Sequence, residues 1–399
     1  MRILTLNCGS STLKFRLFQS TGERGAADLR PEADGIVDRI GGRSFTDFTL
    51  GGERLRQEHD VADHAEATRL ILDWLASIYG PEAIDAVGYR IVHGGASFVE
   101  PTLVDDDVLA GIESLSELAP LHNAPALAAI REARVVLGES VPMVAVFDTA
   151  FHRSMPERAA RYAIPTDLAD RHRVYRYGFH GLAHRYMTER YAVITGAALE
   201  RTKLVTLQLG NGCSAAAVDG GRSIDTSMGF TPLEGLVMGT RSGDIDPSVV
   251  SYLAGREGVE PREVERWLNA QSGLLGVSGR SADMRDLLEA KARGDDRAAR
   301  AVELFCYRAR KYIGAYLAAL GGADAVVFGG GIGENAPAVR ARICAGMEWC
   351  GLRLHADQND ATVASEGRIS AEDSEVAVYV LPVDEELIIA RDTARCVGK

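Results

Sequence analysis

Paired cysteines and long apolar runs are both missing from this sequence. Its six cysteines are scattered without a CxxC pair, so we expect neither a disulfide framework nor a metal cluster. No apolar run approaches the ~20 residues that span a bilayer. The N-terminus also lacks the basic and apolar segments of a signal peptide. We therefore expect a protein of a reducing, cytoplasmic compartment, with no membrane partner.

A basic excess and several common enzyme signatures are absent too. The formal net charge is −12, which argues against a nucleic-acid partner. It does not exclude a small anionic substrate, because local Arg and His side chains can override the global field. No Ser-His-Asp spacing, GxSxG, HExxH or Walker sequence occurs. The usual hydrolases, zincins and P-loop proteins are therefore excluded.

The chain is large enough for two domains. It has 399 residues, more than one hydrophobic core usually serves, and its 46% hydrophobic and 25% charged residues are typical of globular proteins. It contains no low-complexity segment and no solenoid period. The one repetition is a pair of similar hairpins, at residues 3–18 and 204–218.

The first of these hairpins frames the rest of the sequence. Apolar residues alternate on both sides of the turn Asn7–Ser11, which predicts a β-hairpin. The turn is rich in small hydrogen-bond donors, and Lys14 follows it, so it suits a phosphate group. An ordinary tight turn that bonds its own backbone is the alternative. The second copy, with Gly210-Asn211-Gly212 at its turn, favours the phosphate-facing interpretation.

Periodicity predicts alternating strands and helices along the chain. Strands are expected within 34–59 and at 84–92, 142–147, 325–328 and 376–381. Helices are expected at 62–79, 181–191, 247–255, 261–270, 296–320 and the C-terminus. One more helix is expected to begin near residue 105, and another to end near residue 137. Residues 119–125 and 225–247 are expected to be loops.

A third glycine-rich turn, Gly329–Asn335, follows the strand at 325–328. Bare backbone N–H groups at a strand-to-helix turn bind phosphate well. A single glycine-rich turn is weak evidence, because glycines also serve tight turns and close packing. Three of them, each after an apolar strand, predict a nucleotide- or phosphate-binding cleft.

Carboxylates stand beside two strand ends. Asp148 ends the strand at 142–147, and Glu385 and Glu386 follow the last strand. Phosphoryl transfer uses Mg²⁺ held by one or two carboxylates. The alternatives are a strand-end cap for Asp148 and helix N-capping by Asp384 or Glu385.

Arginine and histidine residues flank the same segments. Arg90 ends an apolar strand and Arg241 lies in a Gly/Ser/Asp loop, where a planar guanidinium suits carboxylate or phosphoryl oxygens. The alternative for Arg241 is a buried ion pair with Asp244. His122 and His180 each stand beside a proline or glycine at the mouth of a helix, and both could equally be core histidines.

The full set of motifs resembles the acetokinase family, ATP-dependent carboxylate kinases within the sugar kinase/heat-shock cognate/actin superfamily. The resemblance covers essentially the whole chain. The segments that carry it are NCGSSTLKF (7–15), YRIVHGG (89–95), APLHNAP (119–125), VFDTAFH (146–152), YGFHG (177–181), LGNG (209–212), MGTRSGDIDP (238–247), SGRSADMRD (278–286), GGGIGEN (329–335) and PVDEE (382–386).

The resemblance implies an α/β fold of two duplicated actin-like (ribonuclease H-like) domains around a central cleft. The N-terminal domain would span 1–149, completed by 385–399, and the C-terminal domain, 150–384, would carry the nucleotide site. The partners implied are ATP/ADP and acetate/acetyl phosphate, with Mg²⁺ (or Mn²⁺) as cofactor. A cytoplasmic homodimer is implied, with no nucleic-acid or membrane partner.

The resemblance also implies a role for individual residues. The catalytic group would be Arg90, Asp148, His180 and Arg241, and the metal group Asn7, Asp148 and Glu385. The substrate pocket would be formed by Arg90, Val92, Leu121, His122, Phe179 and Pro232. ATP would contact Lys14, Asn211, Gly212, Asp283, Arg285, Gly331, Ile332 and Asn335, with Ser10 and Thr12 on the phosphate-facing hairpin.

Three positions depart from the family pattern. Gln208 replaces the usual His before LGNG, Val383 replaces a Thr, and Thr12 replaces a Ser. Gln208 can donate a hydrogen bond but cannot carry charge. None of these changes removes an expected metal ligand or arginine.

The resemblance therefore implies the activity of an acetate kinase, the Mg²⁺-dependent, direct and in-line transfer of the γ-phosphoryl group of ATP. Acetate is already ionised at pH 7, so its phosphorylation needs no general base. The expected surplus of cations around the acceptor suits that chemistry. A kinase for propionate or another short-chain acid is the alternative, and a non-catalytic nucleotide sensor is a more remote one.

Overall fold

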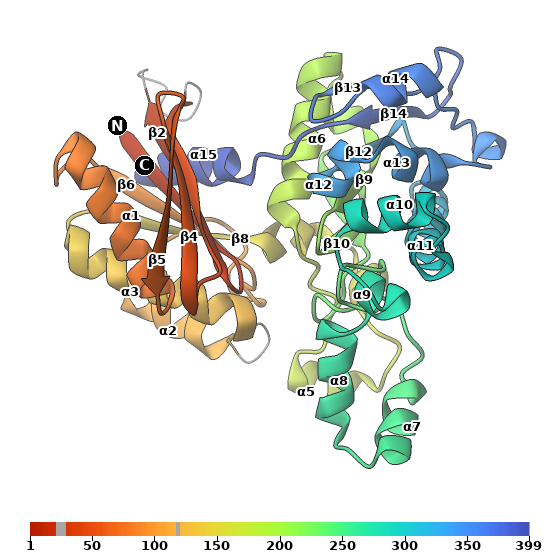
Figure 1. Cartoon of the computed structure of the whole chain (residues 1–399), viewed down its shortest axis with the longest axis horizontal. Coiled ribbons are helices and arrows are strands. Elements are labelled where there is room, and N and C mark those ends of the chain that lie inside the picture. Colours follow the sequence, from red (N-terminus) through yellow and green to blue (C-terminus); the bar gives the residue numbers. More distant parts are fainter. Residues whose placement is uncertain (21–28, 117–119, 399) are drawn as a thin grey trace. The chain divides into compact units, whose positions relative to one another are not determined.

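The computed structural model describes residues 1–20, 29–116 and 120–398, except for the side chains of residues 120–122. The chain forms two compact units. Unit 1 is Met1–Ala150 with Asp384–Lys399, and unit 2 is Phe151–Val383. Each unit contains one β-sheet with helices packed against it (Figure 1).

Unit 1 is built on a sheet of eight described strands in the order β5-β4-β3-β2-β1-β6-β8-β7. Their bounds are β1 Arg2–Cys8, β2 Thr12–Ser20, β3 Leu29–Asp38, β4 Gly42–Leu50, β5 Glu53–Val61, β6 Ala86–Ile91, β7 Thr102–Leu103 and β8 Met143–Phe147. The helices are α1 His64–Tyr79, α2 Asp106–Ser114, α3 Pro120–Leu137 and α15 Glu385–Val397.

Both faces of this sheet are covered, because its central strands are apolar on both sides. On β1, Leu4 and Leu6 belong to the main core, with Ile71 of α1 and Ile130 of α3. Ile3 points to the opposite face and packs with α15 residues. A Cβ at Gly88 of β6 would lie 2.2 Å from Thr393 Oγ1 of α15, so only glycine permits this close approach. The last helix is thereby fixed against the first strands.

Unit 2 is built on a sheet of six described strands in the order β11-β10-β9-β12-β14-β13. Their bounds are β9 Lys203–Leu209, β10 Cys213–Asp219, β11 Arg222–Thr226, β12 Ala325–Gly329, β13 Gly367–Arg368 and β14 Ala377–Val380. The helices are α4 Glu157–Ala160, α5 Thr166–His172, α6 Gly181–Thr195, α7 Ser248–Glu257, α8 Pro261–Ala270, α9 Gly273–Ser278, α10 Met284–Ala292, α11 Asp296–Leu320, α12 Gly330–Asn335, α13 Pro337–Cys344 and α14 Ala356–Ala361.

The two sheets repeat one pairing pattern. In unit 1, β1 is antiparallel to β2, β2 is antiparallel to β3, and β1, β6 and β8 are parallel. In unit 2, β9, β10 and β11 are antiparallel in the same way, and β9, β12 and β14 are parallel. Since β1–β2 and β9–β10 are the two similar hairpins, the duplication expected from them is confirmed.

One expected loop is wrong. Residues 119–125 were predicted as a loop that opens a helix; residue 119 lies outside the described residues, but α3 already begins at Pro120 and contains Pro125. Proline is favoured at the first helical position, where its missing N–H has no intrahelical acceptor. Pro125 removes one bond from the helix. Burial of Leu127 and Ile130 against the sheet outweighs that loss.

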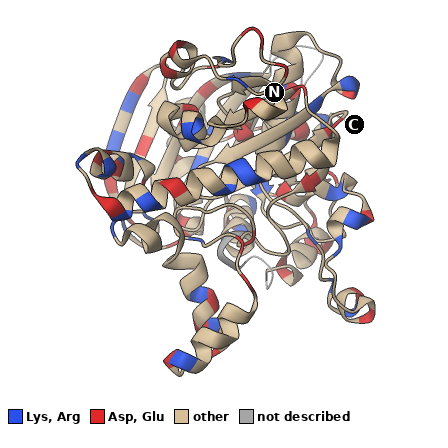
Figure 2. Cartoon of the chain, turned by 90° about the vertical axis from the view of Figure 1, so that its right-hand side faces the viewer, with Lys and Arg blue, Asp and Glu red and all other residues tan. Residues whose placement is uncertain are grey.

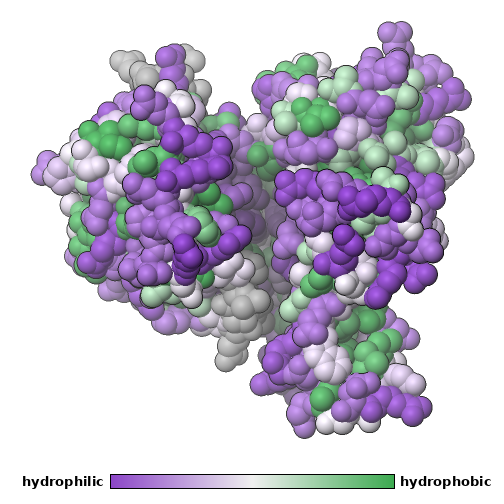
Figure 3. All heavy atoms as spheres, viewed as in Figure 1, coloured by the Kyte–Doolittle hydropathy of each residue, from purple (hydrophilic) through white to green (hydrophobic). Residues whose placement is uncertain are grey.

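Unit 2 carries a satellite core on α7 and α8. Ala254, Val264 and Leu268 are buried there, with Leu253 and Trp267 packed against them. Figure 3 shows apolar side chains on this pair of helices. Among the described helices, none combines the length and apolar character needed to cross a bilayer.

Candidate active site

An arginine–carboxylate cluster lies at the carboxyl ends of the central strands of unit 1. Asp148 Oδ2 accepts hydrogen bonds from Arg90 Nε (3.1 Å) and Nη2 (2.6 Å). Arg90 Nη1 donates to Asn7 Oδ1 (3.0 Å) and lies 3.5 Å from Glu385 Oε2. Asn7 Nδ2 donates to Glu385 (3.0 Å) and Glu386 (3.2 Å). Parallel strands β1, β6 and β8 and the start of α15 therefore bring four predicted site residues together.

This cluster fits a hard divalent cation. Asp148 is fully buried, and its Oδ1 atom has no hydrogen-bond partner among the described residues. A buried carboxylate oxygen without a donor suits Mg²⁺, which takes one or two carboxylates and completes its shell with water and phosphate oxygens. No group of three or more His, Cys, Asp or Glu suited to a metal occurs in the described ranges. Asp148 and Glu385 would hold the ion, with Asn7 beside them, and these three metal contacts stay predictions.

Electrostatics within the cluster favour its charged form. Burial opposes the charge of Arg90, but Asp148 and Glu385 outweigh burial and raise its pKa above the ordinary value. The capping alternative holds for Asp384, whose side chain accepts from the Leu387 N–H at the start of α15. It does not hold for Glu385, which accepts from Asn7 instead.

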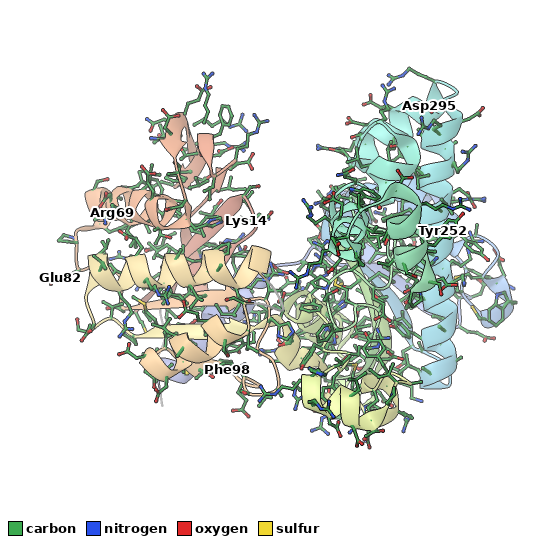
Figure 4. All side chains as sticks on the ribbon, turned by 90° about the horizontal axis from the view of Figure 1, so that it is seen from below. Lys14, Arg69, Glu82, Phe98, Tyr252 and Asp295 are labelled. Carbon is green, nitrogen blue, oxygen red and sulfur yellow. The ribbon has the colours of Figure 1, made fainter. Side chains whose placement is uncertain are left out.

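The turn of the first hairpin is closed by its own backbone. The Gly9 N–H donates to Thr12 O (2.8 Å), and Nε2 of His64 lies 2.9 Å from Gly9 O. Ser10 is exposed, and so is Lys14, whose side chain is labelled in Figure 4. The phosphate-facing role of this turn stays a prediction.

In unit 2, Arg241 is a half-buried cation without a carboxylate partner in the described part of the chain. Its Nη1 donates to Pro232 O (2.9 Å) and lies 3.6 Å from Met238 Sδ. The alternative ion pair with Asp244 is wrong, because Asp244 bonds Arg308 at 2.7 Å. Burial lowers the pKa of Arg241 from its ordinary value.

The bare Gly212 separates Arg241 from His180. A Cβ at Gly212 would lie 3.3 Å from His180 Nε2 and 3.7 Å from Arg241 Nη1. His180 itself has φ 58°, the left-handed region that costs a non-glycine residue about 1–2 kcal/mol. This strained residue is the N-cap directly before α6, and its Nδ1 lies 2.9 Å from Ser214 Oγ. The hairpin turn, His180 and Arg241 thus converge in one place.

A cavity of about 490 Å³ in unit 2 has the size of a nucleotide site. It lies where the β9–β10 turn meets the starts of α10 and α12. Its lining comprises Gly210, Asn211, Ala282, Asp283, Met284, Arg285, Leu288, Gly331, Ile332, Asn335 and Ala336. Six of the eight predicted ATP contacts are therefore together, while Gly212 stands next to the lining and Lys14 belongs to unit 1.

A buried arginine holds one wall of this cavity. Arg340 is fully buried, and its guanidinium donates to the carbonyl oxygens of Gly333, Glu334, Asn359 and Thr362 and to Asn359 Oδ1. Burial lowers its pKa to about 10, so it remains charged at neutral pH. Gly333 and Glu334 belong to α12, the short helix that residues 330–335 form where a glycine-rich turn was predicted, so Arg340 fixes this segment. The sequence reasoning missed it.

The predicted apolar pocket for the substrate divides between the units. Val92 and Leu121 belong to unit 1, and Phe179 and Pro232 to unit 2. Val92 and Phe179 are buried. Leu121 and His122 lie in α3, but their side chains are outside the described part of the structure. The pocket therefore stays a prediction.

Other polar residues around His180 were also missed. His184, Ser214 and Thr206 are fully buried and hydrogen-bonded in series behind it. The spacing of His180 and His184, four residues apart on a helix, could have indicated a shared face. Gln208, the departure from the family pattern, has its Oε1 atom buried and without a partner among the described residues.

Charges on the face drawn in Figure 2 are mixed. Lys and Arg alternate with Asp and Glu along the helices, and neither sign gathers in one region. Binding of an anionic substrate then depends on individual cations such as Arg241 rather than on a basic surface.

Two sheets with one repeated pairing pattern, together with a nucleotide-sized cavity beside a glycine-rich turn, define an actin-like α/β protein of the kinase class. Residues 2–391 match the acetokinase family, and the chain belongs to it. It is 52% identical to the acetate kinase of Solibacter usitatus, over all of this chain and 98% of that one. It is 47% identical to the acetate kinase of Thermotoga maritima, over all of this chain and 99% of that one.

Solved structures agree with this assignment. The acetate kinase of Porphyromonas gingivalis superposes with a TM-score of 0.91 at 41% identity, over 99% of each chain. A propionate kinase from Francisella tularensis superposes with a TM-score of 0.92 at 38% identity, also over 99% of each chain. The resemblance inferred from the motifs is confirmed, as is the two-domain actin-like fold class.

Proposed function

We propose that this chain is an acetate kinase, which transfers the γ-phosphoryl group of ATP to a carboxylate oxygen of acetate in a reversible reaction. The observation that carries the proposal is Arg241. Arg241 is half-buried, has no carboxylate partner among the described residues, and faces His180 across a glycine that has no side chain. Such an arrangement suits a phosphoryl group or a small carboxylate.

The chemistry follows from the charges. Acetate is an anion at neutral pH and needs no proton removed before it attacks phosphorus. Arg241 would orient the acceptor and neutralise charge that develops on the transferring group, and His180 would hydrogen-bond an oxygen of that group. Mg²⁺, held by Asp148 and Glu385, would neutralise phosphate charge when bound. Arg90 would hold Asp148 and Glu385 in place and meet the substrate carboxylate.

The adenine nucleotide would occupy the cavity of unit 2. Its glycine-rich wall exposes backbone groups, and Met284 and Ile332 supply apolar surface for a base. The phosphate-facing residues Asn211 and Gly212 lead from the cavity toward His180. We also propose that Mn²⁺ can replace Mg²⁺ and that the protein is a cytoplasmic homodimer. Size-exclusion chromatography with light scattering would measure the mass of the assembly.

A second candidate function is propionate kinase. It is favoured by the structural neighbour from Francisella tularensis, which bears that name and is as similar in fold as the acetate kinase from Porphyromonas gingivalis. One methylene in an apolar pocket is worth only about 1–3 kcal/mol, so the two activities differ by a factor of about 10–200.

Trapping the acyl phosphate product with hydroxylamine tests both candidate functions, acetate kinase and propionate kinase. The protein is incubated with Mg²⁺, one phosphoryl donor (ATP or diphosphate) and one acid (acetate, propionate or butyrate), and acyl hydroxamate is measured. We expect ATP with acetate to give the highest kcat/KM. A higher value with propionate would select the second candidate. No hydroxamate from any acid would refute the carboxylate kinase function.

A further inference from the structure

A chain of four hydrogen-bonded side chains runs from the core of unit 2 to His180. Thr206 Oγ1 lies 2.7 Å from His184 Nδ1, and His184 Nε2 lies 2.7 Å from Ser214 Oγ. Ser214 Oγ lies 2.9 Å from His180 Nδ1. Strands β9 and β10 supply the hydroxyls, helix α6 supplies His184, and His180 is the residue directly before α6. Thr206, His184 and Ser214 are each fully buried, so water does not share these bonds.

The first step is the protonation state of His184. Burial, and then the neighbouring His152 and His180, hold its pKa well below the ordinary value. At neutral pH, His184 is therefore uncharged and has one N–H and one lone pair. It must donate one of its two hydrogen bonds and accept the other. The two hydroxyls on either side of it consequently point in the same direction along the chain.

Only one of the two directions satisfies every group. If Thr206 donates to His184 Nδ1, then His184 Nε2–H donates to Ser214, and Ser214 donates to His180 Nδ1. In the reverse direction the Thr206 hydroxyl must donate elsewhere, and no acceptor for it exists among the described residues. An unpaired buried hydroxyl is costly. The forward direction is therefore favoured.

We propose that Thr206, His184 and Ser214 are positioning residues that hold His180 as the tautomer with its proton on Nε2. Since Nδ1 accepts from Ser214, a neutral His180 carries its proton on the nitrogen that faces Gly212 and Arg241. That nitrogen then donates a hydrogen bond at the place where the proposed function puts the phosphoryl group. This inference rests on that function for its catalytic meaning, but not for the tautomer itself.

The tautomer is measured directly by two-dimensional ¹H–¹⁵N correlation through the ring couplings of ¹⁵N-histidine-labelled protein. The chain has nine histidines, and the resonances of His180 are those missing from His180→Gln. We expect a protonated Nε2 and an unprotonated Nδ1. A ring that carries a proton on Nδ1 would overturn the proposal. The spectrum needs no substrate, so it remains informative even if the protein makes no acyl phosphate, a result that would refute only the proposed function.

Kinetics test the positioning role. Ser214→Ala should lower kcat about tenfold, the effect of one lost hydrogen bond in the transition state, and leave the KM for ATP unchanged. The matched control is Ser223→Ala. Ser223 is equally buried, and its Oγ lies 2.8 Å from Nδ1 of His152, a histidine outside the hydrogen-bonded chain. This substitution should lower the melting temperature by a similar amount and kcat by less than about twofold.

A double-mutant cycle separates positioning from general stability. In a His180→Ala background, Ser214→Ala should cause no further loss of kcat, because its effect passes through His180. Independent, multiplicative losses would overturn the proposal, and so would a normal kcat for Ser214→Ala alone. If Ser214→Ala does not fold, Thr206→Val against Thr206→Ser repeats the comparison at the far end of the chain. A tautomer shift or lower kcat is expected only in the valine variant, and identical behaviour of the two would contradict the directional bias.

Discussion

Replacing Arg241 with alanine should lower kcat by about 10³-fold, or ~4 kcal/mol of transition-state stabilisation. The magnitude follows from its unused donors. The bonds of Arg241 to Pro232 and Met238 use only Nη1, so the Nε and Nη2 N–H groups have no acceptor within the described chain. Removal of a single preorganised donor typically costs about 10²–10³ in kcat, and an arginine that contacts a transferring phosphoryl group costs about 10³–10⁵.

The assay separates catalysis from binding and folding. ATP affinity, measured by calorimetry, should remain within about threefold of the original, because Arg241 does not line the nucleotide cavity. The Pro232 carbonyl loses a donor, which should cost stability only about 1 kcal/mol. Arg241→Lys keeps the charge but loses the planar fork, and its kcat should be intermediate. Arg222→Ala, an exposed arginine on the same unit, is the control and should be near normal.

A kcat for Arg241→Ala within about fivefold of the original protein would refute this reasoning. So would a loss confined to the KM for ATP, since it would place Arg241 in nucleotide binding instead.

Three further predictions concern other parts of the site. Glu385→Ala should raise the Mg²⁺ concentration for half-maximal rate about tenfold or more, whereas Glu386→Ala should not; equal titrations would remove Glu385 from the metal site. Gly212→Ala should lower kcat about tenfold, because its Cβ would lie 3.3 Å from His180 Nε2 and displace that ring; an unchanged kcat would show that the ring position is not critical. Gln208→His should change kcat about threefold or more while shifting the melting temperature by less than about 2 °C, and a silent substitution would make this departure from the family pattern neutral.

The fold could be predicted from the sequence where the pattern is local. Alternation around Gly9 and Gly210 gave both hairpins, and helical spacing gave α11 with its observed bounds, 296–320. The start of α3 could not be predicted this way. A segment with two prolines resembles a loop in the sequence. The helix forms because its apolar face is buried against the sheet of unit 1.

The site could be predicted from the sequence where its residues follow a recognisable strand. Asp148 and Glu385 stand at visible strand ends, and the structure brings both to Arg90. Arg340 could not be found, because an arginine on a helix usually lies in water, and its acceptors come from two segments that are distant from each other in the sequence. The role of Ser214 could not be predicted either, because it depends on His180 and His184, which only the folded structure brings next to it.

Oxygen-18 labelling of the acceptor tests the central claim most directly. The protein is given ATP, Mg²⁺ and acetate labelled on both oxygens, and the ³¹P spectrum of the products is recorded. Direct attack of the carboxylate on the γ-phosphorus predicts acetyl phosphate with its ³¹P resonance shifted by a bridging ¹⁸O, and ADP without label. Labelled AMP, or no labelled acetyl phosphate, would contradict the assignment of this chain as an acetate kinase.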